Sequence, residues 1–138
     1  MSPRLYSALA TAWGGREGRV TSEDGRLDLQ LSVPASVGGD DGQGTNPEQL
    51  FAAGYSACFH SALKLVASRR KIDVAGSAVS VEVSLVNDDG FSIEVAIEAE
   101  LPGVEPGVAK ELIEAAHQVC PYSKATRNNI PVTLSTTS

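Results

Sequence analysis

The chain has 138 residues, 42% of them hydrophobic, and a formal net charge of −6 at pH 7. A chain of this length can form one domain with a single core, and we expect one domain over residues 1–138. The acidic balance argues against nucleic acid or an anionic membrane surface as a partner, because both select basic faces.

The first predicted element is a β-hairpin. The turn Ser22–Gly25 separates a strand at residues 18–21 from a second strand at 27–31, which alternates apolar and polar residues. A glycine-rich loop follows at 38–44. It lacks the Gly-Lys-Ser/Thr ending of a phosphate-binding loop, and its two aspartates would repel an anion.

The longest predicted helix begins near Pro47 and runs to about Arg70. Its start, Thr45–Glu48, combines a capping residue, a proline near the first helical position and a glutamate that could close a capping box. Apolar residues then cover most of the circumference, so we expect a central, largely buried helix. Polar residues interrupt the segment, so we do not expect it to span a membrane.

A second hairpin has the clearest pattern in the chain. Valine, leucine and isoleucine alternate with serine and glutamate at residues 79–85 and again at 91–99, and Asn87–Gly90 forms the turn between them. We expect two antiparallel strands with one face on a core and the other in water.

The C-terminal third is predicted to contain two helices and a strand. An apolar stripe marks a helix at residues 106–119, and Pro121 opens a short helix that runs through Arg127. A final strand is expected at 132–134. The predicted class is therefore α+β, with antiparallel sheets packed around a central buried helix.

The chain contains two cysteines, Cys58 and Cys120. The N-terminus lacks the apolar run of a secretory signal, so we expect a cytoplasmic location, where structural disulfides are rare. Two thiols in that setting are more typical of redox chemistry or metal binding than of a structural crosslink. Taken alone, Cys58 fits a small hydrophobic residue of a buried helix. Cys120 lies at a helix terminus, where the amides of the next helix would lower its thiol pKa.

Zinc binding is one interpretation. Two cysteines and two histidines could serve as ligands: Cys58, His60, His117 and Cys120. On a helix, however, Cys58 and His60 would lie about 200° apart, so one of them would face away from a shared ion. Neither half of the set has the short paired spacing of a structural zinc site.

A redox-active thiol pair is the alternative. A cysteine that reduces peroxides must be a thiolate at neutral pH, so it needs a positive neighbour and a pocket that excludes water. Arg16 is a candidate because it follows Trp13–Gly15, whose glycines would let the backbone bring a side chain close to a site. The other candidate cations are Arg19, Arg26, Arg69, Arg70 and Arg127.

Three segments carry a family resemblance: Ala10–Gly18 (ATAWGGREG), Gly44–Phe59 (GTNPEQLFAAGYSACF) and Val119–Ser123 (VCPYS). In this order they resemble the organic hydroperoxide resistance (Ohr) family, a branch of the OsmC-like superfamily, over nearly the whole chain. The long middle segment favours the Ohr branch over its OsmC relatives. Lys124 departs from the family pattern, where a neutral polar residue is expected.

The resemblance implies an OsmC-like α+β fold that forms a tightly intertwined homodimer, with active sites at the subunit interface. It implies that Cys58 is the peroxidatic thiol and that Cys120 is the resolving thiol that forms a disulfide with it. Arg16 would hold the thiolate and polarise the peroxide, and Glu48 would orient Arg16. No bound cofactor or metal is implied; the reductant would be a dihydrolipoyl group on a lipoylated protein.

The expected substrate is an alkyl or fatty-acid hydroperoxide, because an apolar pocket around Cys58, lined by Tyr55 and Phe59, would select it over hydrogen peroxide. On one continuous helix, Glu48 and Cys58 would lie about 15 Å apart along the axis and on different faces. We therefore expect Glu48 or Arg16 to reach Cys58 from the partner subunit. Two other functions remain open: a non-catalytic zinc-binding stress-response module, and an OsmC-type peroxidase of broader specificity.

Overall fold

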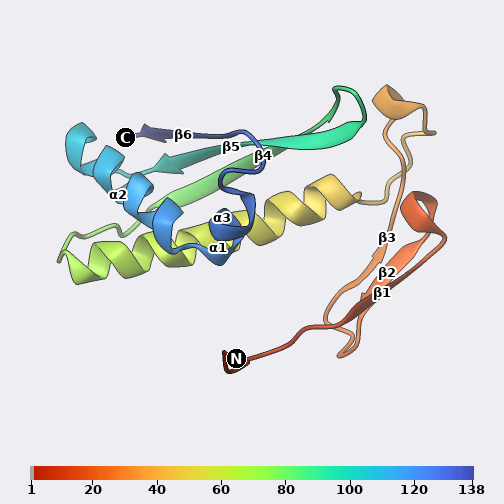
Figure 1. Cartoon of the computed structure of the whole chain (residues 1–138), viewed down its shortest axis with the longest axis horizontal. Helices are drawn as coiled ribbons and strands as arrows, with labels where there is room; N and C mark the ends of the chain where they lie inside the picture. The colour runs from red at the N-terminus through yellow and green to blue at the C-terminus, as the bar shows by residue number, and fades with distance from the viewer. Residues whose placement is uncertain (1) are drawn as a thin grey trace. The chain divides into compact units, whose positions relative to one another are not determined.

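The computed structural model describes residues 2–138, so Met1 of the predicted domain lies outside the described residues. The chain divides into two compact units, Met1–Leu50 and Phe51–Ser138, and the boundary falls within helix α1 (Pro47–Arg69). Figure 1 shows the order of helices and strands in each unit. A single domain over 1–138 stays a prediction.

The first unit contains a three-stranded antiparallel sheet. Its strands β1 (Ala10–Trp13), β2 (Arg19–Ser22) and β3 (Asp28–Gln30) pair in chain order. This arrangement confirms the predicted hairpin of β2 and β3. The sequence pattern did not reveal β1, because the strand has only four residues, all of them exposed, and is ordered by pairing with β2. Short 3-10 turns lie at Gly15–Glu17 and Ala35–Val37.

The second unit contains the other sheet. Strands β4 (Ala78–Asn87) and β5 (Phe91–Glu100) form the predicted antiparallel hairpin over their full length. Strand β6 (Val132–Thr137) pairs parallel with β5, so the expectation of antiparallel pairing is wrong for this strand. The chain reaches β6 through helices α2 (Pro106–Val119) and α3 (Pro121–Thr126), and such a helical crossover returns a strand in the parallel direction.

The core of the second unit lies on one face of this sheet. Inward-facing Val95, Ile97 and Ala99 of β5 belong to a single hydrophobic cluster that also contains buried residues of α1 and α2. The alternating residues Glu94 and Glu98 on the opposite face are exposed. The predicted separation of a core face and a water face is therefore confirmed, as is the α+β class.

Helix α1 begins where the sequence predicts, because Asn46 Oδ1 accepts the backbone N–H of Gln49 at 2.8 Å. Its burial in the single chain is one-sided rather than general, since Leu65 is 42% exposed. Among residues 2–138 it is also the one helix with the length and apolar composition to cross a membrane, a test that core helices pass as well. Its buried side chains are those of Tyr55, Phe59, Ala62, Leu63, Val66 and Ala67.

Candidate active site

The two cysteines lie together in the second unit. Cys58 is partly buried in the middle of α1, and Cys120 is fully buried between α2 and α3. Their Sγ atoms are 3.7 Å apart, and both residues are free thiols. A disulfide bond is about 2.05 Å long, so a small movement would join the two sulfur atoms.

The chain direction at Cys120 explains how this thiol reaches α1. The backbone N–H of Cys120 donates to the carbonyl oxygen of Ala116 at 2.9 Å and completes the last turn of α2. Cys120 itself has an extended conformation, as expected for a residue that precedes a proline, and Pro121 then starts α3. The Cys-Pro step therefore turns the chain between two helices and leaves the thiol inside.

The surroundings of Cys58 disfavour its thiolate within the single chain. Burial raises the pKa of the Cys58 thiol above its ordinary value. A hydrogen bond from the backbone N–H of Tyr122 acts in the opposite direction, and Cys120 raises the pKa further. None of these contributions comes from a cation. A positive group beside the sulfur atom would favour the thiolate.

Aromatic rings pack around Tyr122, the residue whose backbone N–H bonds Cys58. The Tyr122 ring makes an edge-on contact with Phe51, with centroids 5.9 Å apart, and a tilted contact with Tyr55, with centroids 5.5 Å apart. Tyr122 also lies across Gly54, where an added Cβ would be 2.5 Å from the phenolic oxygen. Gly54 and Tyr122 are thus matched parts of the site that sequence reasoning did not single out, although both fall inside the quoted motifs.

The two predicted pocket residues are fully buried in the core cluster. Tyr55 and Phe59 are each 0% exposed. The Tyr55 hydroxyl also has two partners, the Ser123 and Thr126 hydroxyls, at 2.8 and 3.0 Å. A role for Tyr55 and Phe59 in lining a substrate pocket stays a prediction. Tyr122 is 37% exposed and is the most exposed aromatic residue of this cluster.

The first unit holds the arginine–glutamate pair. The two terminal nitrogens of Arg16 donate to the two carboxylate oxygens of Glu48 at 2.7 and 2.8 Å, in bidentate geometry. The hydrogen bonds from Arg16 hold the pKa of Glu48 below its usual value, and Glu48 raises the pKa of Arg16. Both groups are therefore charged at neutral pH, with the guanidinium fixed in one orientation.

The backbone before and after Arg16 depends on glycine. Gly14 has a φ of 79°, a left-handed conformation that other residues rarely adopt. A Cβ on Gly18 would lie 1.6 Å from the carbonyl oxygen of Trp13. These two positions close a tight turn that presents Arg16 toward Glu48, which gives a structural reason for the glycines that suggested Arg16 as a candidate.

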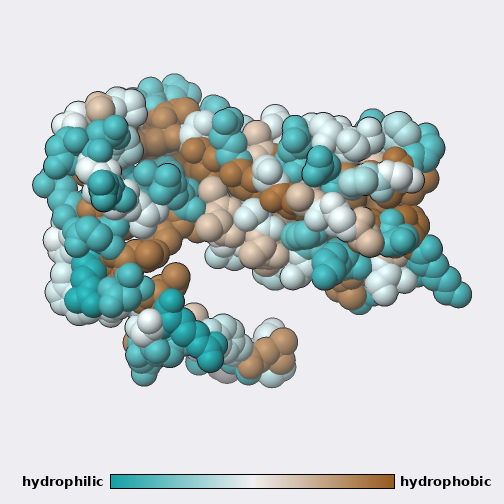
Figure 2. All heavy atoms as spheres, turned by 180° about the vertical axis from the view of Figure 1, so that it is seen from behind, coloured by the Kyte–Doolittle hydropathy of each residue, from teal (hydrophilic) through white to brown (hydrophobic). Residues whose placement is uncertain are grey.

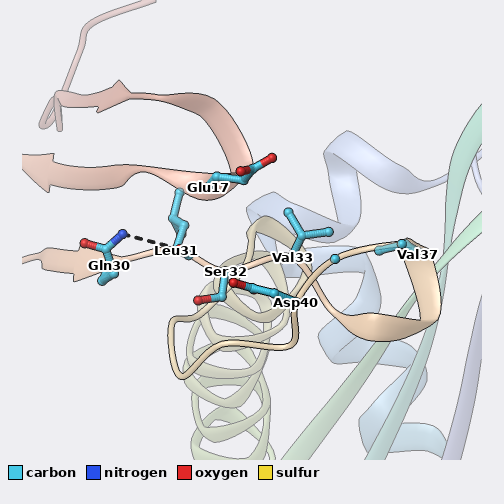
Figure 3. A pocket seen from close by; sticks show the side chains of 9 residues that line it. Glu17, Gln30, Leu31, Ser32, Val33, Val37 and Asp40 are labelled. Atoms are coloured by element: carbon cyan, nitrogen blue, oxygen red, sulfur yellow. Dashed lines mark hydrogen bonds between the residues drawn. The ribbon is translucent and has the colours of Figure 1, made fainter.

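The first unit also contains a separate hollow, whose lining residues are shown in Figure 3. Its volume is about 530 Å³. Glu17, Ser32 and Asp40 supply polar groups, and Leu31 and Val33 supply apolar ones. The described residues that line it include no cysteine, histidine or basic side chain. It therefore lacks the groups that thiol chemistry or anion binding would require.

The four residues considered for zinc do not converge on one point. His60 Nε2 pairs with the Ser77 hydroxyl at 2.9 Å, and His117 Nδ1 pairs with the Ser123 hydroxyl at 2.7 Å. Within residues 2–138 there is no group of three or more histidine, cysteine, aspartate or glutamate side chains placed to hold a metal ion. The described residues therefore contain no set of ligands that would support a zinc-binding role.

Comparison with known proteins gives matches along nearly the whole chain. The profile of the family described as OsmC-like protein matches residues 38–135. An organic hydroperoxide resistance protein of Xanthomonas axonopodis pv. citri is 52% identical over 133 residues, which cover 94% of this chain and 93% of that protein. Among solved structures, an organic hydroperoxide resistance protein OsmC from Legionella pneumophila has a TM-score of 0.92 and 46% identity, covering 99% of this chain and 100% of that one. The organic hydroperoxide resistance protein OhrB of Bacillus subtilis has a TM-score of 0.88 and 46% identity, covering 96% of this chain and 99% of that one.

Proposed function

Because the chain belongs to the organic hydroperoxide resistance proteins of the OsmC-like family, we propose that it is a cysteine-based peroxidase that reduces organic hydroperoxides to alcohols. The observation that carries the proposal is the 3.7 Å separation of the Cys58 and Cys120 sulfur atoms. The named relatives supply the substrate class, and the thiol pair supplies the chemistry.

The proposed reaction has three balanced steps. The Cys58 thiolate attacks the outer oxygen of the hydroperoxide, the O–O bond breaks, and the alkoxide takes up a proton to leave as an alcohol. Cys58 is then a sulfenic acid. The Cys120 thiol attacks the Cys58 sulfur, forms the disulfide and releases water. A dithiol reductant then reduces the disulfide to two thiols and is itself oxidised to a disulfide.

The reductant we propose is a dihydrolipoyl group carried by a lipoylated protein, which would leave the reaction as the cyclic lipoyl disulfide. This part of the proposal rests on the family resemblance. A cytoplasmic location would suit such a donor, because a reducing compartment keeps both cysteines as thiols between turnovers.

We also propose that the active enzyme is a homodimer in which Arg16 of one subunit serves Cys58 of the other. Helix α1 runs unbroken over Pro47–Arg69, which is the geometry on which the expected separation of Glu48 and Cys58 depends. Burial raises the pKa of Cys58, so a positive group supplied by a second chain would stabilise the thiolate.

Exposed apolar side chains support an assembly of this kind. In the single chain, Leu5 is 96% exposed, Tyr6 is 81% exposed and Trp13 is 57% exposed. Hydrophobic residues lie open on the surface shown in Figure 2. Large apolar groups gathered within one short segment are more typical of an interface than of a monomer surface.

A steady-state assay tests the peroxidase proposal. Peroxide consumption is followed with cumene hydroperoxide, a fatty-acid hydroperoxide or hydrogen peroxide as substrate, and with dihydrolipoamide or thioredoxin as donor. We expect turnover of the organic peroxides with dihydrolipoamide and none for Cys58→Ser. Equal rates with all three peroxides would favour the broader OsmC-type specificity, and a fully active Cys58→Ser enzyme would exclude the mechanism.

A complementation assay tests the shared site. Arg16→Ala and Cys58→Ser chains are each expected to be inactive alone. If Arg16 acts across the interface, a mixed dimer contains one complete site, and random reassociation restores about one quarter of wild-type activity. If Arg16 acts within its own chain, no mixed dimer holds a complete site and no activity returns.

A further inference from the structure

Helix α3 carries the backbone that follows Cys120, but it has only six residues and little stability of its own. It is held in place by a buried group of hydrogen-bonding side chains. Ser123 lies at the centre and is 0% exposed, with its hydroxyl 2.8 Å from the Tyr55 hydroxyl and 2.7 Å from His117 Nδ1. Thr126 closes the group from the last turn of α3.

One arrangement of the hydrogens makes every contact in this group. The Thr126 hydroxyl donates to the carbonyl oxygen of Ser123 at 3.2 Å, so it has no hydrogen left for Tyr55. In the arrangement that keeps all of these contacts, Tyr55 donates to Thr126 and Ser123 donates to Tyr55. In that arrangement Ser123 has no hydrogen for His117, and Nδ1 of His117 donates to the Ser123 hydroxyl.

The result is a complete chain of donors from His117 through Ser123 and Tyr55 to Thr126, and every contact in it is used. At the His117 end of the chain, the Arg127 guanidinium donates to the carbonyl oxygen of His117. Buried polar groups with all partners satisfied fix one local geometry, whereas removal of one member leaves a neighbour without a partner.

We propose that Tyr55 and His117 are positioning residues for Cys120: their hydrogen-bond chain holds α3 on α1 so that the Cys120 sulfur stays within bonding reach of Cys58. His117 is three residues before Cys120 and Ser123 is three residues after it, so the chain spans the turn that carries the thiol. The sulfur atoms are 3.7 Å apart, and they must approach to about 2.05 Å to bond. A shift of α3 of the order of 1 Å would therefore change the equilibrium constant for disulfide formation.

This inference rests on the proposed function for its biological meaning, but its test does not. The reduced protein is equilibrated with mixtures of reduced and oxidised glutathione, and the fraction of Cys58–Cys120 disulfide is measured by alkylation and mass spectrometry. In this equilibrium two glutathione thiols reduce the protein disulfide and become glutathione disulfide. No peroxidase activity is needed.

Tyr55→Phe removes one hydroxyl and keeps the ring. We expect it to lower the equilibrium constant for disulfide formation about tenfold, which makes the reduction potential about 30 mV less negative. His117→Leu should act in the same way. His117→Asn, whose side-chain amide can donate from nearly the same place as Nδ1, should restore most of the loss. Ser56→Ala is the matched control, because its hydroxyl lies on the same helix but bonds the carbonyl oxygen of Ala53.

Wild-type potentials in both Tyr55→Phe and His117→Leu would overturn the proposal, as would an equal shift in Ser56→Ala. If Tyr55→Phe does not fold, the comparison of His117→Asn with His117→Leu decides the question, and equal potentials for those two would count against it. A wild-type protein that reduces no hydroperoxide would remove the proposed function, whereas a shifted potential would still support the positioning role.

Discussion

Substitution of Gly54 by alanine tests the packing of Tyr122 against α1. A Cβ at this position would lie 2.5 Å from the phenolic oxygen of Tyr122 and 3.2 Å from its Cζ. The first separation is too short for any real contact, and the second is tight but tolerable with a small adjustment. The clash is therefore almost entirely with one hydroxyl group.

Two opposing contributions set the size of the effect. Alanine in place of glycine within a helix is favourable by about 1 kcal/mol. Overpacking against a neighbouring side chain costs about 1–3 kcal/mol. We expect Gly54→Ala to lower the free energy of unfolding by up to about 2 kcal/mol in the wild-type background. In a Tyr122→Phe background the hydroxyl is gone, so the same substitution should raise it by up to about 1 kcal/mol.

The assay is a double-mutant cycle in urea at one fixed protein concentration, since the proposed dimer would make stability concentration-dependent. The coupling energy between Gly54 and Tyr122 equals the overpacking cost and is expected to be about 1–3 kcal/mol. The pKa of the Cys58 thiol should also be higher in Gly54→Ala than in wild type. A displaced Tyr122 would move away the backbone N–H that stabilises the thiolate. An equal cost of Gly54→Ala in both backgrounds would refute the reasoning.

Three further predictions concern the thiol and the ion pair. Cys120→Ser should reduce one equivalent of hydroperoxide and then accumulate Cys58 sulfinic acid, measured as an added mass of two oxygens; normal cycling with dihydrolipoamide would contradict the resolving role. Arg16→Lys cannot reproduce the bidentate pair, so it should raise the pKa of Cys58 in the assembled enzyme and slow the first turnover about tenfold, as seen by stopped-flow peroxide consumption. The pKa of Glu48 is lowered in the folded chain, so the stability from its pair is present above the ordinary glutamate pKa and lost as pH falls below about 4.3. Glu48→Gln should therefore lose less stability than wild type as pH falls below about 4.3. The difference should be no more than about 1 kcal/mol, because the Arg16 side chain is 41% exposed. Identical acid profiles of the two proteins in urea titrations would contradict this prediction.

Much of the fold follows from local pattern. The alternating runs of β4 and β5, the capped start of α1 and the proline that begins α3 are all written in a few adjacent residues, and each element forms where it is predicted. Strand β1 and the parallel pairing of β6 are different. Strand β1 pairs with the next strand along the chain, β2, but its four residues are all exposed, whereas β6 pairs with a strand distant in the sequence, β5. Neither carries a local signal that specifies the pairing.

The candidate site divides in the same way. Cysteines and a glycine-flanked arginine can be found in the sequence from their chemistry, and the family resemblance pairs them. The hydrogen-bond chain of Tyr55, Ser123 and His117 could not be predicted from the sequence, because serine and histidine side chains are usually solvated. Only the fold brings these three side chains together in the protein interior. The sequence suggests His117 only as a possible metal ligand, whereas in the structure its Nδ1 forms a hydrogen bond with the Ser123 hydroxyl.

The pKa of Cys58 connects the chemistry to the assembly. A partly buried thiol whose pKa is raised is a poor nucleophile, and a cation beside it would restore the thiolate. The same burial that suppresses the charge also excludes water, so a guanidinium brought next to the sulfur would act with little screening. If Arg16 arrives with a second subunit, each chain by itself keeps an unreactive thiol, and the reactive form exists only where the interface has closed. Such an arrangement confines a strong nucleophile to the assembled enzyme and leaves the unassembled chain resistant to oxidation.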